Sequence, residues 1–418
     1  MKRITLNYTL IITFFLMLIV IGCKKDEQPT IPVLLSVEPS SITDISAISG
    51  GNITSDGGAI ITIRGVCWGT NPLPTINNSK TLDGTGLGSY TSIINGLQPG
   101  TTYHLRAYAT NSVGTGYGAD ILFSSTTTTP ILTTVVVSTI TAETASSGGV
   151  ITSDGGAEVT SRGVCWGVNQ NPTIANNKTT NETGLGSFTS NITNLLPNTT
   201  YYLRAYATNS VGTSYGNEIT FTTFAVMDID GNGYYSISIG TQVWLVENLR
   251  VTHYRNGEPI PNVTDNTQWN NLTTGAYCYK YNETNVEAKL GFLYNWYTIA
   301  DSRNLCPIGW HVATDAEWTT LVNYLGGNSV AGGKMKETGT AHWWSPNTDS
   351  DNSSGFTAVP AGQRSPDGSF YFGNACFWTS TSENATNARS WFLSPNDTSV
   401  TRYYDFKGSG FNIRCVKD

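Results

Sequence analysis

Cysteine is the residue type with the widest chemical scope in this 418-residue chain. A thiol can be acylated, oxidised to a disulfide, bound to a metal or activated as a nucleophile. The seven cysteines form three groups: one near the amino terminus, one in each copy of a repeat, and four beyond residue 270. They are Cys23; Cys67 and Cys165; and Cys278, Cys306, Cys376 and Cys415. Because the three groups have different sequence surroundings, we expect their thiols to have different chemical roles.

Cys23 follows a sequence that is typical of an export signal. Basic Lys2 and Arg3 precede an apolar run, from about Leu10 to Ile21, that is too short to span a bilayer comfortably. The residues Val20-Ile21-Gly22-Cys23 resemble a bacterial lipobox. This resemblance implies cleavage before Cys23, acylation of its thiol and a chain anchored to a membrane outside the cytoplasm. An ordinary signal peptide, followed by a cysteine that is there by chance, is the alternative.

The charged cluster Lys24-Lys25-Asp26-Glu27 comes directly after the anchor position. It resembles the export tag of surface lipoproteins in the Bacteroidetes, which implies an outer-membrane lipoprotein exposed at the cell surface. A solvated linker would also be polar, so this alternative stays open. We predict a signal peptide at 1–22 and a linker at 23–32.

The composition points to an exported protein rich in β-structure. Charged residues make up 13% of the chain, about half the usual share for a soluble domain. Thr, Ser, Asn and Gly take their place, as expected where short strands alternate with turns. The net charge is −7 and there is no basic stripe. Because nucleic acids are bound mainly through basic side chains, a nucleic acid partner is not expected.

An internal repeat with a constant offset of 98 residues is the clearest pattern in the chain, since Leu105 returns as Leu203. Three pairs of segments show it: Gly50–Gly58 and Gly148–Gly156, Arg64–Gly69 and Arg162–Gly167, and Leu105–Thr115 and Leu203–Thr213. Short alternating runs separated by turn residues predict about seven strands in each copy. The repeat therefore predicts two all-β sandwich domains, at 33–129 and 130–224.

The segment Leu97–Tyr103, with Pro99 and Thr101 inside it, resembles the corner between strands E and F of a fibronectin type III domain. In that family the tyrosine hydroxyl ties the corner to the backbone. Leu195, Pro197, Thr199 and Tyr201 occupy the same places in the second copy. The resemblance implies two immunoglobulin-like, fibronectin type III-like sandwiches. It says little about function, because sandwiches host many activities.

The sequence after Phe224 predicts an α+β domain at 225–418. Thr314 and Glu317 form a capping box, and the apolar residues that follow have helical spacing. A second short helix is expected around Val330–Glu337. Strands are expected at Tyr234–Ile239, Gln242–Val246, Gly291–Tyr294, Phe377–Thr379, Arg389–Phe392 and Phe411–Val416.

Several motifs follow one another in this domain. They are Gln242-Val243-Trp244, Glu247-Asn248-Leu249, Tyr254-Arg255-Asn256-Gly257, Leu293-Tyr294-Asn295-Trp296, Cys306-Pro307, Gly309-Trp310-His311-Val312, Trp318, Gly355-Phe356, Trp378-Thr379-Ser380-Thr381 and Arg414-Cys415-Val416. In this order they resemble the Fibrobacter succinogenes major paralogous domain. That family occurs on exported bacterial proteins and is related to the C-type lectin and formylglycine-generating-enzyme fold group. The resemblance therefore implies a C-type lectin-like fold, and it implies no established biochemical function.

The four cysteines of this domain favour disulfides in an oxidising compartment, and three pairings are open. We expect Cys306–Cys415, because a loop-rich domain gains most stability when the entry of its helix is joined to its last strand. Cys278–Cys376 is then the second candidate pair. A zinc site is the alternative. No Cys-x-x-Cys pair and no histidine at ligand spacing support zinc, so we predict no metal.

A polar loop after two adjacent tryptophans is the candidate binding surface. Its candidate contact residues are Trp343, Trp344, Asn347, Asp349 and Asp351. Flat rings stack on the apolar faces of sugars. Lectins of this fold group bind sugar through loop carboxylates, amides and calcium, but this chain lacks their Glu-Pro-Asn and Trp-Asn-Asp signatures. A solvated loop, with the rings packed in the core, is the alternative. We expect one ring of the pair to face solvent, and Trp318, Trp378 and Trp391 to lie in the core.

No catalytic motif is present in the chain. It lacks HExxH, GxSxG and the glycine patterns of nucleotide-binding folds. The segment Asp228–Gly233 resembles the start of an EF-hand loop, but Ile239 stands where such a loop needs glutamate, so a turn is expected. We predict no catalytic residue and no cofactor.

Three functions are consistent with these patterns. The first is a lipid-anchored surface protein whose sandwiches carry a C-terminal domain that binds polysaccharide or a surface protein, for example in adhesion. The second is a structural component of an envelope assembly. The third is a cryptic glycoside hydrolase, in which two carboxylates converge in space.

Overall fold

The computed structural model describes residues 28–285 and 287–418. Cys23, the signal peptide predicted at 1–22 and the charged cluster at 24–27 lie outside the described residues and stay predictions. The chain divides into two compact units between Thr128 and Thr129. The first unit contains a β-sandwich, and the second contains another sandwich and an α+β domain. This confirms the predicted fold class at the level of sandwiches followed by an α+β region.

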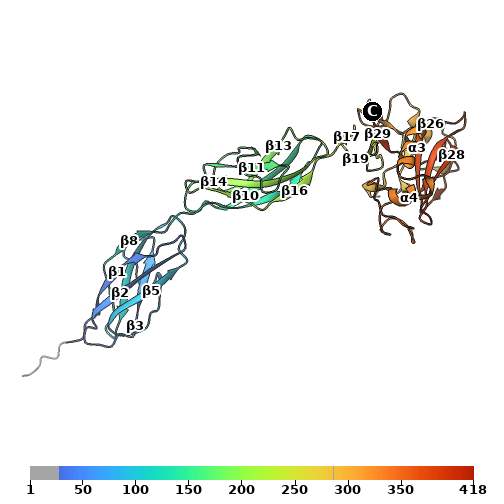
Figure 1. Ribbon diagram of the computed structural model, residues 1–418. Coiled ribbons are helices and arrows are strands. Elements are labelled where there is room, and N and C mark those ends of the chain that lie inside the picture. Colours follow the sequence, from blue (N-terminus) through green and yellow to red (C-terminus); the bar gives the residue numbers. More distant parts are fainter. Residues whose placement is uncertain (1–27, 286) are drawn as a thin grey trace, which may run out of the picture. The chain divides into compact units, whose positions relative to one another are not determined.

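Two antiparallel sheets form the first sandwich (Figure 1). One sheet has the order β1-β2-β5 and the other has the order β4-β3-β6-β7, with β8 also paired to β6. The strands are β1 (Val33–Ser40), β2 (Ser46–Ser55), β3 (Ile63–Gly69), β4 (Ser79–Lys80), β5 (Gly88–Asn95), β6 (Thr102–Thr110), β7 (Thr115–Tyr117) and β8 (Ile121–Ser124). Such a division of strands between two sheets is that of an immunoglobulin-like sandwich.

The second sandwich repeats this plan. One sheet has the order β13-β10-β9, and the other has the order β12-β11-β14-β15, with β16 paired to β14. The strands are β9 (Ile131–Ser138), β10 (Ala145–Ser153), β11 (Ser161–Gly167), β12 (Asn177–Lys178), β13 (Gly186–Ile192), β14 (Thr200–Thr208), β15 (Thr213–Tyr215) and β16 (Ile219–Thr222). The 98-residue offset therefore describes the structure as well as the sequence.

A buried tyrosine fixes the same corner in both sandwiches. The hydroxyl of Tyr103 accepts a hydrogen bond from the backbone N–H of Gln98 at 2.9 Å, and that of Tyr201 accepts one from Leu196 at 2.9 Å. The corner expected from the fibronectin resemblance is thus present twice. Without this bond, a buried hydroxyl and a backbone donor would both lack a partner.

The single cysteine of each sandwich is a buried free thiol. Cys67 and Cys165 lie in strands β3 and β11, where neither is accessible to solvent. Burial raises the pKa of each thiol to about 11. They therefore stay protonated at neutral pH and act as small apolar side chains.

The α+β domain is closed by strands from its two ends. A four-stranded sheet has the order β19-β20-β29-β23. Its strands are β19 (Ser236–Ile239), β20 (Gln242–Leu245), β23 (Trp310–Val312) and β29 (Cys415–Lys417). Trp244 lies opposite Val416 in this sheet, so the first and last segments of the domain are held together.

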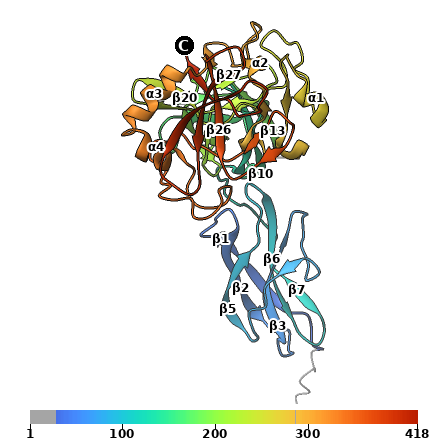
Figure 2. The same ribbon diagram turned by 90° about the vertical axis from the view of Figure 1, so that its right-hand side faces the viewer.

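A second sheet and two helices enclose the main core of this domain (Figure 2). The sheet has the order β26-β27-β28, and the helices α3 and α4 pack against it and against each other. These elements are β26 (Ala375–Ser382), β27 (Asn387–Leu393), β28 (Val400–Phe406), α3 (Asp315–Tyr324) and α4 (Asn328–Met335). The predicted capping box of Thr314 and Glu317 begins α3. Trp318, Trp378 and Trp391 are buried, as expected.

The remaining elements of the domain are short and are joined by long loops. They are β17 (Val226–Met227), β18 (Gly233–Tyr234), α1 (Asn266–Asn270), β21 (Tyr277–Cys278), η1 (Lys280–Asn282), η2 (Ala288–Leu290), β22 (Leu293–Tyr294), α2 (Trp296–Ile299), β24 (Gln363–Arg364) and β25 (Phe370–Tyr371). Two strand expectations were wrong. Phe411–Val416 is mostly irregular, because only its last two residues join β29, and the seven-residue strand β28 was not expected at all.

No helix in the part of the chain that the structure describes is long and apolar enough to cross a bilayer.

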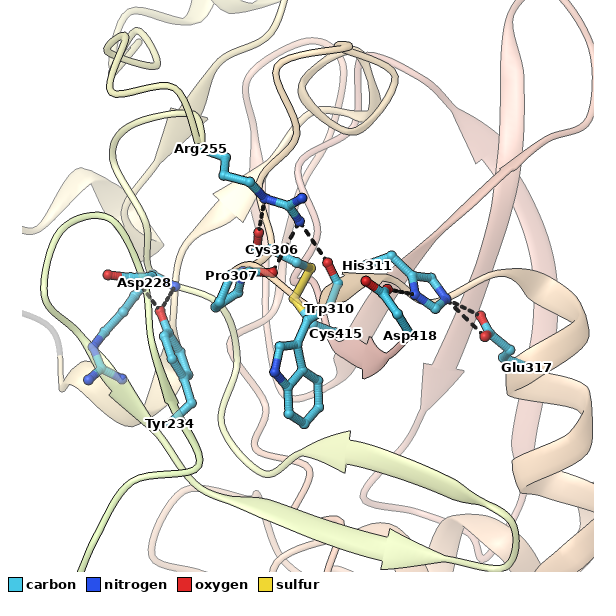
Figure 3. The surroundings of a disulfide bond; sticks show 11 residues. Asp228, Tyr234, Arg255, Cys306, Pro307, Trp310, His311, Glu317, Cys415 and Asp418 are labelled. Carbon is cyan, nitrogen blue, oxygen red and sulfur yellow. Dashed lines mark hydrogen bonds and ion pairs between the residues drawn. A yellow bond between two sulfur atoms is a disulfide. The ribbon is translucent and has the colours of Figure 1, made fainter. Parts of the chain in front are cut away.

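The expected disulfide Cys306–Cys415 is present (Figure 3). It joins residues 109 positions apart and links the segment before β23 to β29. Arg255 secures the same segment, because its guanidinium donates to the carbonyl oxygens of Cys306 at 2.8 Å and Trp310 at 2.7 Å. A covalent link across so long a loop removes much of the entropy of the unfolded chain.

The second candidate disulfide, Cys278–Cys376, is not formed. Both residues are buried free thiols and belong to different apolar clusters. Cys278 packs with Trp269 and Leu293, whereas Cys376 packs with Trp378 and Phe411. The even number of cysteines in this domain therefore did not predict the number of disulfides, because two of the four thiols are packed as small apolar side chains.

We predict that loss of the Cys306–Cys415 bond destabilises the α+β domain selectively. Replacing both residues by alanine should lower its free energy of unfolding by about 2–5 kcal/mol, the usual effect of a native disulfide. Calorimetry of the mature chain measures this, and the transitions of the two sandwiches serve as the internal control. Peptide mapping should find Cys306 linked to Cys415 and free thiols at Cys278 and Cys376. A linked Cys278–Cys376 peptide would contradict the assignment.

Candidate functional site

A buried lysine holds the loop that carries the predicted contact residues. Lys336 follows α4 directly and its side chain is inaccessible to solvent. Its ammonium group donates to the carbonyl oxygens of Thr348 at 3.0 Å, Ser394 at 3.1 Å and Asp397 at 2.8 Å. Burial lowers the pKa of Lys336. These bonds fasten the loop after the tryptophan pair to the turn between β27 and β28.

One of the two adjacent tryptophans is buried and the other is exposed, as expected. Trp343 is 2% exposed, and its indole N–H donates to the carbonyl of Ala358 at 3.0 Å. Trp344 is 60% exposed. Its six-membered ring lies against Gly373, where an added Cβ would come within 2.7 Å of the ring atom Cε3. Only glycine at that position allows the ring to rest there.

The backbone conformation of the loop largely explains why polar residues occur in it. Asn347, Asp349 and Asn352 adopt left-handed φ angles of 47°, 46° and 48°, which Asn and Asp tolerate better than most residues. The Asn347 amide also donates to the carbonyl oxygens of Glu337 and Gly339. Asn347 is buried, so it serves the loop's conformation.

Asp349 and Asp351 are exposed, but they lie along α4. The backbone N–H of Asp351 donates to the carbonyl of Gly333 in that helix at 3.1 Å, and its carboxylate accepts from the N–H of Ser353. No hydrogen bond or ion pair joins either residue to Trp344 in the part of the chain that the structure describes. Of the five candidate residues, Trp344, Asp349 and Asp351 are therefore accessible, while Trp343 and Asn347 are not.

Trp344 is part of a group of exposed and half-buried aromatic residues, which we call the aromatic surface. Its members are Trp344, Tyr281, Phe370, Tyr371 and Phe372. Tyr281 lies 4.1 Å from Phe372 and 5.8 Å from Phe370, measured between ring centroids. Tyr371 is 53% exposed and Tyr281 is 40% exposed. The segment Phe370–Gly373 thus joins the Tyr281 ring to the Trp344 ring.

Tyr281 adopts a backbone conformation that bulky residues rarely take. Its φ angle is 59°, and that of Asn282 is 61°. A left-handed tyrosine costs on the order of 1–3 kcal/mol unless the surroundings impose it, and such residues gather at functional sites. Sequence reasoning did not find Tyr281 or Tyr371. The Tyr-Asn pair of a tight turn was the available signal, and it was too common to single out.

A charged cluster lies next to Trp344 in the chain. His342 pairs with Glu337 at 2.6 Å and with Glu287 at 2.8 Å, and Lys289 pairs with Glu337. Burial opposes the charged form of His342, but its hydrogen bonds to Glu287 and Glu337 outweigh this effect and raise its pKa. A chain of opposite charges therefore joins the loop before Trp344 to the segment around residue 288.

The described residues show no arrangement suited to catalysis by a thiol. Burial raises the pKa of Cys278 to about 12 and that of Cys376 well above its usual value, and Cys415 is in the disulfide. The EF-hand-like segment is a turn, as expected. Asp228 accepts from the N–H groups of Asp230 and Asn232 and from the Tyr234 hydroxyl. Within 28–285 and 287–418, no three His, Cys, Asp or Glu side chains gather as metal ligands would.

One comparison with known proteins covers the α+β region. Residues 237–417 match the model of the Fibrobacter succinogenes major domain. The α+β region is such a domain. It follows two sandwiches, and a crystal structure of the chicken CNTN1 FN1–FN3 domains is similar over 47% of this chain and 69% of that chain, at 16% identity and a TM-score of 0.21. No curated protein matches the sequence.

We predict that His342 makes the stability of the Fibrobacter succinogenes major domain depend on pH. Because its pKa is higher in the folded chain, the contribution is complete below about pH 6.5 and is lost as the pH rises through the raised value. His342→Gln should flatten this dependence, measured by chemical unfolding between about pH 5 and 9. Glu287→Gln should lower the pKa of His342 in an NMR titration. An unchanged value would contradict the proposed charge coupling.

Proposed function

We propose that this chain is an exported, lipid-anchored binding protein whose C-terminal domain contacts polysaccharide through the aromatic surface. One observation carries the proposal. Ten of the eleven tryptophans are at most 9% exposed, whereas Trp344 is 60% exposed. A large apolar ring left in water is unfavourable by about 1.5–3 kcal/mol relative to its burial, so its exposure favours a contact role.

The chemistry of the aromatic surface suits a sugar polymer. Flat rings cover the C–H faces of pyranoses, and tyrosine hydroxyls add hydrogen bonds at the ring edges. Trp344 and Tyr371 provide such rings, and Tyr281 provides a third on the other side of Phe370–Gly373. Several rings in a row would bind an extended chain better than a single small sugar. In this proposal the two sandwiches act as spacers between the anchor and the binding domain.

A structural role in an envelope assembly is the second candidate, and β28 favours it. This strand is at the edge of its sheet in the described part of the chain, and Tyr403, Tyr404 and Phe406 on it are exposed. An exposed edge strand with apolar side chains can pair with a strand of another protein. Protein contact would then involve β28, and polysaccharide contact would involve Trp344.

We predict that Trp344→Ala weakens retention on an insoluble polysaccharide by at least about tenfold, because a buried tryptophan contact contributes about 1.5–3 kcal/mol. Its exposure means that the free energy of unfolding should change little. Tyr404→Ala is the matched control, since it removes an equally exposed ring from β28. Pull-downs of the mature chain on cellulose, chitin and cell-wall glycan test this. Loss of binding with Tyr404→Ala alone would favour the protein-contact role instead.

The proposed anchor has its own test. Metabolic labelling with a fatty-acid probe should mark the chain, and Cys23→Ala should abolish the label, whereas Cys67→Ala should retain it. Protease treatment of intact cells should release fragments of the sandwiches if the chain is displayed at the surface. A soluble, unlabelled product with a free Cys23 thiol would refute the lipid anchor.

A further inference from the structure

The second sandwich contains an open hollow of about 610 Å³ that is separate from the aromatic surface. Residues from the end of β11, the following loop, β12 and the tyrosine corner line it. Its volume lies within the range of about 300–1,000 Å³ that is common for small-molecule sites. We call it the amide hollow, because asparagine and glutamine side chains dominate its walls.

Two aromatic side chains of the sandwich core reach the base of the hollow. Trp166 is 8% exposed, and its indole N–H makes no hydrogen bond with any residue that the structure describes. The Tyr201 hydroxyl accepts from the Leu196 N–H at 2.9 Å and has no acceptor for its own hydrogen among the described residues. The base thus offers apolar surface and two unused donors.

The walls present amides that the sandwich itself does not use. The side chains of Asn169, Gln170, Asn177 and Asn194 are exposed and form no hydrogen bond with any described residue. Each amide offers both a donor and an acceptor. Exposed Val168 and Leu196 add apolar contact area.

The charge of the lining narrows the class of ligand. No Asp, Glu, Lys or Arg lines the hollow. A phosphate or carboxylate ligand would need cationic partners, and a divalent metal would need carboxylates. A neutral molecule with many hydroxyl groups and an apolar face fits amides, free indole and phenol donors, and exposed aliphatic side chains.

The first sandwich shows which of these features the fold requires. At the 98-residue offset, Trp166 and Tyr201 correspond to Trp68 and Tyr103, so the aromatic base is common to both copies. Three amides are not: Gln170, Asn177 and Asn194 correspond to Pro72, Ser79 and Gly96. The first copy forms the same two sheets without them. These amides are therefore dispensable for folding.

The position of Asn194 supports the same conclusion. Its φ angle is 58°, and Gly96 has a φ angle of 77° at the matching position. Glycine takes this conformation without a steric penalty, and asparagine is among the few other residues that tolerate it. The second copy thus has an amide side chain at a site where the backbone alone would favour glycine.

We propose that the amide hollow is a second, independent binding site that takes a neutral saccharide unit. The amides would bind the sugar hydroxyls, and Trp166, Val168 and Leu196 would contact its C–H groups. This site goes beyond the aromatic surface of the C-terminal domain, because it lies on another domain and uses none of the same residues.

The test replaces the amides of the second copy by the residues of the first. The variant Gln170→Pro, Asn177→Ser and Asn194→Gly introduces only side chains that the same fold already contains. The reciprocal variant Pro72→Gln, Ser79→Asn and Gly96→Asn, in the first sandwich, is the matched control. Probes are neutral cello-, manno- and chito-oligosaccharides, and binding to the mature chain is measured by calorimetry and by chemical shifts of the Trp166 and Asn side-chain signals.

We expect at least one neutral oligosaccharide to shift the Trp166 signal, and the triple variant to bind it at least about tenfold more weakly with an unchanged unfolding transition. The reciprocal variant and Trp344→Ala should bind it as the unaltered chain does, which separates this site from the aromatic surface. Binding by the triple variant at full strength would overturn the proposal. So would the absence of any shift with all the probes at millimolar concentration.

Discussion

The α+β domain depends on satisfying buried backbone carbonyl groups in a fold with little regular structure. Arg414 meets part of this requirement. Its guanidinium is inaccessible to solvent and donates to the carbonyl oxygens of Leu245, Phe356 and Thr357 at 3.0, 2.7 and 3.0 Å, and to the Asn248 side chain at 2.8 Å. Burial lowers its pKa to about 9, so it is still charged at neutral pH. Because the loops that it joins are far apart in the sequence, loss of the guanidinium would leave several acceptors without partners at once. The adjacent Cys415 adds a covalent link at the same place.

Buried cations that bind backbone carbonyl groups also position the candidate site. Arg364 is also fully buried and donates to the carbonyl oxygens of Val263, Thr264 and Gly368, and its guanidinium lies 5.1 Å from the centroid of the Phe370 ring. It therefore fixes the segment from which Tyr371 projects. Lys336 fixes the loop after Trp344 in the same way, because its ammonium group donates to three carbonyl oxygens. These buried cations are bound by backbone carbonyl groups and have no direct carboxylate partner. The loops that supply the carbonyl groups can therefore move little, because each lost hydrogen bond would leave the buried charge less compensated. Rigid loops of this kind can hold exposed rings in a fixed arrangement without help from helices or long strands.

Sequence reasoning succeeded where one local pattern determines the outcome. The tyrosine corners, the Thr314–Glu317 capping box and the exposure of one tryptophan follow from short-range spacing, and the repeat follows from its constant offset. It failed where the decisive partner is a backbone carbonyl or a distant residue. Nothing in the residues around Arg364 or Lys336 shows which carbonyl groups they bind, because every residue carries the same acceptor. The pairing of Cys278 with Cys376 was wrong for a related reason, since burial in separate clusters is a property of the whole fold. Strand β28 was missed because exposed aromatic residues at an edge do not show the inward and outward alternation of a half-buried strand.

The two sandwiches make it possible to separate what the fold needs from what it does not. Residues that both copies share, such as Trp68 and Trp166 or Tyr103 and Tyr201, are buried and hold the sheets together. Their presence twice is explained by packing alone. Differences between the copies that alter neither topology nor register have no such explanation. In the second copy they include three amides around one hollow, together with Val168, Ala175 and Leu196 where the first copy has Thr70, Asn77 and Gln98. This exchange places amides and apolar side chains at new positions around the hollow, and a neutral ligand can use both kinds of group. Because packing of the sheets does not require this exchange, it is the feature on which the proposed binding role of the second sandwich rests.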